Sequence, residues 1–156
     1  MLGEGGFLTS LEIWKPRSLL GESSRHFGAE EAQGTNPTMR AKIRHIFSPD
    51  IENLETWYPE DPDRFGFLLE LIIGPADEEG EELFTFEVCT PQWLRERRET
   101  ESAVFGHHRI LVFDYDYRRI RQMVEGLVER TRGESWTEVA TKLNRYATWE
   151  FEDYSE

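Results

Sequence analysis

The stretches FGFLLELIIGP at residues 65–75 and LFTFEVC at residues 83–89 decide the fold of this chain. In each stretch the side chains alternate between two sets, as they do along a β-strand, and both sets of the first stretch are mostly apolar. A strand that is apolar on both faces belongs at the centre of a sheet. Because the connection between the two stretches is short and acidic, we predict an antiparallel hairpin.

Further elements are predicted on either side of this hairpin. Two-residue alternation predicts three more strands, at 41–47, 110–113 and 149–152. A 3.6-residue period predicts a helix over 116–131, and the pair Thr90-Pro91 and the capping box at 135–138 begin two other helices. This order is typical of an α+β fold with two layers, a mainly antiparallel sheet of about four to five strands and helices packed on one face.

The pattern also predicts where particular side chains point. The first strand should carry four residues on one largely apolar face: Ala41, Ile43, His45 and Phe47. The strand at 110–113 is predicted to be apolar on both faces. The helix over 116–131 should include Met123 in its apolar stripe. Trp149 and Phe151 are expected in the core.

The length of the chain, 156 residues, is enough for one ordinary domain. Residues 1–38 are interrupted repeatedly by glycine, serine and proline and show no sustained period, so we expect a poorly packed N-terminal leader or extension. Residues 39–156 form the expected α+β domain. The patterned sequence begins at Met39, which makes this residue a candidate for the start of the native protein.

The charge of the chain is strongly negative. There are 18 Lys and Arg residues against 31 Asp and Glu residues, which gives a formal net charge of −13. A protein that grips nucleic acid neutralises phosphates with basic side chains, so this charge argues against a nucleic-acid partner. We expect a basic protein as the partner instead.

The cysteine count and the hydropathy pattern restrict the cellular compartment and the cofactors that we expect for the protein. Cys89 is the only cysteine, so no intrachain disulfide can form, and a reducing cytoplasm suits the chain. No apolar run approaches the roughly 20 residues that cross a bilayer, so we expect no membrane partner. No cluster of Cys and His has zinc spacing and no phosphate-binding loop is present, so we predict no cofactor.

Acidic residues are interleaved with aromatic residues in the connection at 50–64 and at 149–154, and the turn at 77–82 is acidic. Aromatic anchors beside charged groups are typical of protein-binding surfaces, and such surfaces would steer a cationic partner if they lay together. Simple solvation explains any single cluster equally well. The predicted partner-binding residues are Trp57, Tyr58, Glu60, Asp61, Asp63, Glu78, Glu79, Glu150, Glu152, Asp153 and Tyr154.

Catalysis is the alternative interpretation. His107 and His108, with nearby carboxylates such as Asp114, would suit a small hydrolase or a metal-dependent enzyme. Adjacent residues on a strand point to opposite faces, however, so the two histidines cannot chelate as a unit unless they lie in a turn. Cys89 follows Glu87 in an acidic chain, which disfavours a reactive thiolate. We therefore favour a protein without catalytic residues.

A set of short motifs also occurs in a fixed order between Met39 and Tyr154. The motifs are Ser48-Pro49-Asp50-Ile51, Tyr58-Pro59-Glu60-Asp61-Pro62, the stretch 65–75 with its Ile-Gly-Pro ending, Cys89-Thr90-Pro91-Gln92-Trp93-Leu94, Asp114-Tyr115-Asp116-Tyr117 and Trp149-Glu150-Phe151-Glu152-Asp153-Tyr154. This ordered set resembles the immunity protein 8 family of bacterial polymorphic toxin systems. The resemblance implies a small cytoplasmic antidote, encoded beside a toxin, that protects its producer by binding the toxin domain. It implies no catalytic residues, and we expect the cognate toxin to be basic, for example a nuclease.

Overall fold

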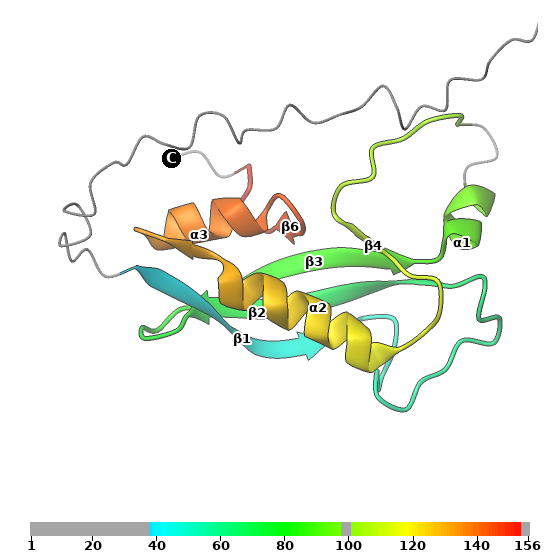
Figure 1. Cartoon of the computed structure of the whole chain (residues 1–156), viewed down its shortest axis with the longest axis horizontal. Coiled ribbons are helices and arrows are strands. Elements are labelled where there is room, and N and C mark those ends of the chain that lie inside the picture. Colours follow the sequence, from blue (N-terminus) through cyan, green and yellow to red (C-terminus); the bar gives the residue numbers. More distant parts are fainter. Residues whose placement is uncertain (1–37, 98–100, 154–156) are drawn as a thin grey trace, which may run out of the picture. The chain divides into compact units, whose positions relative to one another are not determined.

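The computed structural model describes residues 38–97 and 101–153 (Figure 1). The predicted leader lies outside these residues except for Thr38, and so does Tyr154. Within the described residues the fold is α+β, with one mixed sheet and three helices. The predicted α+β class is therefore confirmed.

The predicted hairpin forms the centre of the sheet. Strands β2 (Gly66–Pro75) and β3 (Glu82–Cys89) pair antiparallel, from Gly66 opposite Cys89 to Ile73 opposite Glu82. Strand β1 (Met39–Phe47) pairs antiparallel with the other edge of β2, so β2 is a central strand, as its apolar sequence predicts. Its odd-numbered residues, such as Leu69 and Leu71, are buried, and the alternate set is only partly covered.

Three short strands complete the six-stranded sheet within the described part of the chain. They are β4 (Arg109–Leu111), β5 (Arg132–Gly133) and β6 (Thr148–Trp149). Strand β5 pairs with β1 and β6 pairs with β3, both antiparallel, whereas β4 pairs parallel to β3. The sheet is therefore mainly antiparallel, as predicted, with one parallel pair at its edge.

A β-bulge in β1 shows that the prediction of one shared face for Ala41, Ile43, His45 and Phe47 is wrong. Ile43 pairs with Ile73, but His45 pairs with Ile72, so Arg44 is an extra residue with no partner in β2. An extra residue exchanges the faces of all the side chains that follow it. Ile46 therefore lies beside the buried Leu71, while His45 and Phe47 lie on the opposite face from Ile43.

The helices begin where their capping residues predict. Helix α1 (Pro91–Glu96) has Thr90 as N-cap, α2 (Tyr117–Arg130) has Asp116, and α3 (Trp136–Leu143) has Ser135. In α3 the Ser135 hydroxyl accepts a hydrogen bond from the Glu138 amide. The Glu138 carboxylate accepts a hydrogen bond from the amide of Glu134. In a capping box this carboxylate would accept from the amide of the N-cap residue, which is the next residue, Ser135.

The main core lies between the sheet and α2, which crosses in front of β1 and β2 in Figure 1. Ile120, Val124, Leu127 and Val128 supply the buried stripe of α2. Met123 does not belong to it, since 58% of this residue is exposed. At 100° per residue Met123 stands at the edge of the stripe, and the neighbouring β4 is too short to cover it.

The opposite face of the sheet is covered in part by helix α1. An added Cβ on Gly66 would lie 2.4 Å from the Trp93 ring, so Trp93 of α1 packs directly over the glycine backbone. Gly66 alternates with the buried Phe67, and Trp93 therefore covers the face opposite the main core.

Two of the predicted strands are shorter and more exposed than expected. Ile110 and Val112 are buried, but Leu111 is exposed and Phe113 exposes 75% of its surface, so β4 is buried on one face only. At the C-terminus Trp149 stacks on Phe84, whereas 39% of Phe151 is exposed, so its expected place in the core is wrong. The chain turns after Trp149, which ends the alternation that predicted a longer strand.

Candidate functional site

The long connection between β1 and β2 is fixed to the body of the protein. Ile51 and Leu54 are buried in the core, which holds this long connection in place. The Asp50 carboxylate accepts a hydrogen bond of 2.8 Å from the amide of Leu68 in β2. The connection therefore presents its remaining side chains from a defined position.

An aromatic cluster joins this connection to the segment between β4 and α2. The Trp57 ring meets Tyr115 edge to face at 4.8 Å and packs in the same way on Phe65 and Phe67. The Tyr115 hydroxyl donates a hydrogen bond of 2.5 Å to the carbonyl oxygen of Leu54. Two segments that are distant in the sequence thus form one structure at one end of the sheet.

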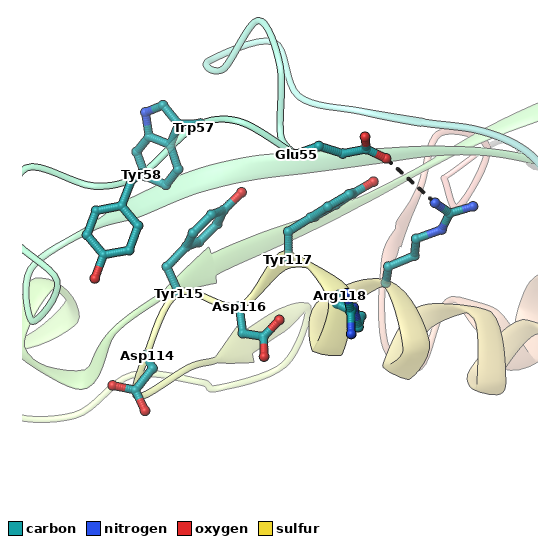
Figure 2. Close-up of a pocket in the computed structure, with 9 residues that line it drawn as sticks. Glu55, Trp57, Tyr58, Asp114, Tyr115, Asp116, Tyr117 and Arg118 are labelled. Atoms are coloured by element: carbon teal, nitrogen blue, oxygen red, sulfur yellow. Dashed lines mark ion pairs between the residues drawn. The ribbon is translucent and has the colours of Figure 1, made fainter.

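A cavity of about 820 Å³ opens at this junction (Figure 2). The rings of Trp57, Tyr58, Tyr115 and Tyr117 line it together with charged side chains of both segments. We call residues 55–63 and 113–117 the acidic aromatic end. This surface contains the predicted residues Trp57, Tyr58, Glu60, Asp61 and Asp63.

Two tyrosines of the cavity, Tyr115 and Tyr117, have a raised pKa. Burial raises the pKa of Tyr115 to about 12, and the neighbouring Tyr117 adds to the shift. Burial also raises the pKa of Tyr117, although Arg121 opposes the change. Both phenols are therefore neutral at physiological pH, so they offer apolar ring faces and hydroxyl groups rather than negative charge.

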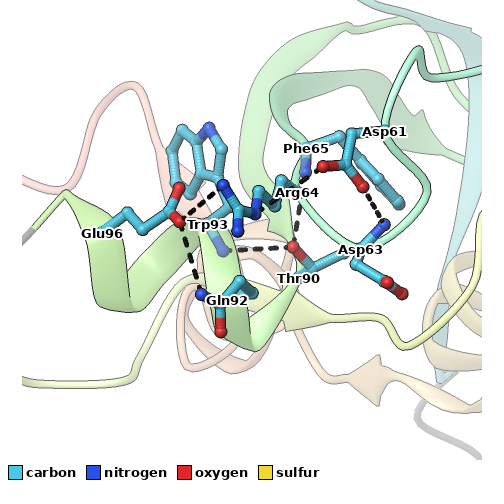
Figure 3. Close-up of polar contacts among 8 residues, drawn as sticks. All are labelled: Asp61, Asp63, Arg64, Phe65, Thr90, Gln92, Trp93 and Glu96. Carbon is cyan, nitrogen blue, oxygen red and sulfur yellow. Dashed lines mark hydrogen bonds and ion pairs between the residues drawn. The ribbon is translucent and has the colours of Figure 1, made fainter.

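Some carboxylates of the acidic aromatic end are already committed to the fold. Asp61 accepts a hydrogen bond from the Asp63 amide at 3.0 Å and lies 3.6 Å from the Arg64 guanidinium (Figure 3). Asp116 caps α2 and pairs with Arg119, and Glu55 lies 3.8 Å from Arg121.

Other carboxylates of this surface are uncommitted. Glu60, Asp63 and Asp114 are exposed, and no cation among residues 38–97 and 101–153 lies within ion-pair distance of them. They stand beside Tyr58 and Phe113, which expose 65% and 75% of their surfaces. Uncompensated charge and exposed aromatic rings therefore occur together here.

Helix α1 and its N-cap hold the end of the connection between β1 and β2 in place. The Thr90 hydroxyl accepts hydrogen bonds of 3.3 Å from the amides of Phe65 and Trp93, and the Arg64 guanidinium pairs with Glu96 at 3.1 Å (Figure 3). These contacts join the last residues of the connection to α1. The position of the neighbouring Asp63 is thus set by the fold on both sides.

The remaining predicted acidic residues lie at the other end of the sheet. Glu78 and Glu79 are exposed in the turn between β2 and β3. Arg44 donates to the carbonyl oxygens of Pro75 and Glu78, at 2.7 and 3.1 Å, and thereby holds this turn against β1.

The C-terminal acidic residues are near this turn. The Glu150 carboxylate accepts a hydrogen bond of 2.7 Å from the amide of Leu83, and the indole of Trp149 donates to Glu82 at 2.7 Å. Glu150 is thus a structural residue, while Glu152 and Asp153 are exposed.

The structure divides the predicted partner-binding residues into two groups. Strand β2 separates them by its ten residues, or roughly 30 Å at 3.3 Å per residue. One group is the acidic aromatic end, and the other comprises Glu78, Glu79, Glu150, Glu152 and Asp153. The sequence prediction omitted 114–117 from the site, although the alternation of acidic and aromatic residues in Asp114-Tyr115-Asp116-Tyr117 was a usable signal.

The histidines considered for catalysis make structural contacts. His108 adopts a positive φ of 63°, and its ring nitrogens lie 2.8 Å from the carbonyl oxygen of Asn144 and 3.1 Å from the Thr148 hydroxyl. His107 meets the His108 ring edge to face. Across the described residues, no group of three or more His, Cys, Asp or Glu side chains is placed to hold a metal ion. Cys89 is fully buried on β3.

The comparison with known families identifies the chain. The family model of immunity protein 8 matches residues 41–154, and the chain belongs to this family. Comparisons with curated proteins and with solved structures found no match. Membership indicates an immunity protein of a toxin system, whose partner is a toxin protein. No helix in the described part of the chain is long and apolar enough to span a membrane.

Proposed function

We propose that this protein neutralises a cognate toxin domain in the cytoplasm by binding it, without catalysis, at the acidic aromatic end. The observation that carries the proposal is the uncommitted charge of Glu60, Asp63 and Asp114 beside the exposed rings of Tyr58 and Phe113. Family membership supports the general role. Because Glu78, Glu79, Glu152 and Asp153 at the other end of the sheet are also exposed, the choice of surface rests on the exposed rings of Tyr58 and Phe113 beside the charge.

The chemistry of this surface favours a basic toxin, such as a nuclease. A nuclease binds the phosphates of its substrate with Lys and Arg side chains, and carboxylates can occupy the same cationic surface. Exposed tyrosine and phenylalanine rings supply anchors that bury large areas with few rotatable bonds. Because Asp50, Leu54 and Thr90 fix the surrounding backbone, little order has to be gained on binding.

The proposal is tested by reversing the uncommitted charges together. In the triple variant E60K/D63K/D114K we expect the association rate with the purified, catalytically inactive toxin domain encoded beside this gene to fall about 30-fold at low salt. Surface plasmon resonance measures the rate, and growth of cells that express the active toxin measures protection.

A matched variant distinguishes local contact from net charge. E78K/E79K/E152K makes the same change in charge at the other end of the sheet, where these side chains are exposed. We expect it to slow association only a few-fold, through the long-range field. Equal effects of the two variants would assign recognition to net charge alone, and a larger effect of the second would place the toxin at the opposite end.

A further inference from the structure

An apolar groove of about 350 Å³ lies between β4 and α2. Its inner lining comes from buried core residues such as Ile110 and Leu127. Leu111, Met123 and Tyr146 also line the groove, and each of them exposes half or more of its surface. The described residues therefore leave a continuous apolar surface uncovered, which is typical of a binding site rather than of scattered exposed side chains.

The charge around this groove is opposite to that of the whole chain. Arg109, Arg130 and Arg145 line it, together with two histidines, and no Asp or Glu is among its lining residues, although the net charge of the protein is −13. Arg109 is paired with Glu87 at 2.7 Å. For Arg130 and Arg145, no carboxylate in the described ranges lies within ion-pair distance. We call Leu111, Met123, Arg130, Arg145 and Tyr146 the cationic groove.

Helix α2 separates the cationic groove from the cavity of the acidic aromatic end. Met123 and Arg130 are seven residues apart and therefore lie on the same flank of the helix. Tyr117 and Arg121 line the cavity of the acidic aromatic end, from the opposite flank of α2. Gly126 lies on the groove side, and Arg130 reaches back across it, 3.8 Å from the position of an added Cβ. One helix thus carries binding surfaces of opposite charge on its two flanks.

We propose that the cationic groove binds an acidic segment of the toxin domain that carries an apolar side chain. The apolar side chain fills the groove beside Met123, and the carboxylates of the segment pair with Arg130 and Arg145. Charge complementarity selects this occupant, because Arg130 and Arg145, which have no carboxylate of the described ranges within ion-pair distance, attract an anionic segment. The inference rests on the proposed function, and it adds a second contact that fixes the orientation of the toxin across α2.

The test reverses the charge of the groove in the full-length chain. We expect R130E/R145E to raise the dissociation rate of the inactive toxin domain about tenfold, because loss of short-range ion pairs acts mainly on dissociation. K42E/R95E changes the charge equally at two exposed cations away from the groove and should leave the dissociation rate unchanged. M123D should raise the rate similarly, whereas M123L should keep it within about twofold of the wild-type rate.

The outcomes separate this inference from the proposed function. If the groove variants dissociate like wild type while E60K/D63K/D114K binds more slowly, the groove inference is wrong and the proposed function stands. If the wild-type chain does not bind the toxin at all, the proposed function fails, and the inference fails with it. If R130E/R145E instead abolishes self-association of the free chain in sedimentation velocity, the groove is an interface between copies and the inference is overturned.

Discussion

Both ends of the sheet are acidic in sequence, but they differ in the aromatic side chains that accompany their carboxylates. At the end where β3 begins, Glu82 accepts a hydrogen bond from the Trp149 indole and Glu150 accepts one from the Leu83 amide, which together hold Trp149 and Glu150 against β3. At the acidic aromatic end, Glu60, Asp63 and Asp114 have no such contacts within the described residues. Exposed carboxylates without ion pairs in the described ranges also occur at Glu78, Glu79, Glu152 and Asp153, so charge alone does not identify a recognition surface. The strongly exposed rings of Tyr58 and Phe113 distinguish the acidic aromatic end.

The aromatic residues show the same contrast. Trp149 stacks on Phe84 with nearly parallel rings, and its indole nitrogen is hydrogen-bonded. Trp57 meets its neighbours edge to face and lies beside a cavity. Both tryptophans are half-buried, but Trp57 lines a cavity together with the exposed Tyr58, whereas Trp149 packs on Phe84 and Phe151. We therefore expect Trp149 to contribute to stability and the acidic aromatic end to contribute to binding.

The largest effect that this comparison predicts is on stability. Trp149→Ala removes the stacked ring and leaves Glu82 without its donor, so the free energy of unfolding should fall by about 3 kcal/mol. Trp149→Phe keeps a ring and loses the N–H group, and should cost about 1 kcal/mol. Urea unfolding measures both changes. A loss below about 1 kcal/mol for the alanine variant would contradict the structural role assigned to this end.

A smaller effect is expected on the association rate as salt is raised. The Debye length shortens from about 10 Å at 0.1 M salt to about 3 Å at 1 M, so wild-type association with the toxin should slow about tenfold over this range. The variant E60K/D63K/D114K should lose most of this dependence, because its steering charges are reversed. Stopped-flow measurements at several salt concentrations provide the test, and a wild-type rate that is independent of salt would exclude electrostatic steering.

The smallest effect concerns the hydrogen bond that joins the two segments. Tyr115→Phe removes the donor to the Leu54 carbonyl and should lower the free energy of unfolding by about 1 kcal/mol at neutral pH. The pKa of Tyr115 is raised from 10.0 to about 12 in the folded protein, so the native state binds this proton more tightly than the unfolded state does. Its contribution is complete below pH 10 and is lost as the pH rises toward 12.

Comparing urea unfolding of wild type and Tyr115→Phe across this range isolates that contribution, since the other titrating groups are common to both proteins. The stability difference between them should shrink as the pH rises above 10. A difference that stays constant would show that the phenol is equally easy to ionise in the folded and unfolded chains.

The parts of the fold that sequence patterns predicted are those that depend on neighbours along the chain. The hairpin of β2 and β3, the caps at Thr90 and Ser135 and the stripe of α2 are all local. The bulge at Arg44 was not predicted, because the sequence prediction counts His45 with the apolar face; the alternation in fact breaks at Arg44 and His45, which are two consecutive polar residues. Only pairing with β2 shows that one residue is extra.

The site was predicted in part for a similar reason. The sequence identified Trp57, Tyr58 and the acidic residues that follow them, since these share one connection. It could not show that Tyr115 packs against Trp57, because 58 positions separate the two residues and the contact depends on the parallel pairing of β4 with β3. Nor could it show that Asp61 is engaged by Arg64 whereas Asp63 is not.

The extra residue in β1 also affects how the family can vary in length. Deleting Arg44 would restore regular pairing without changing the faces, because His45 would still pair with Ile72, Ile46 with Leu71 and Phe47 with Glu70. A relative that lacks this position would keep Ile46 on the buried face but would lose the guanidinium that donates to the carbonyl oxygens of Pro75 and Glu78. The strand can therefore lose one residue at Arg44 without compensating substitutions on its buried face, and the loss affects the turn at Glu78, which this side chain holds.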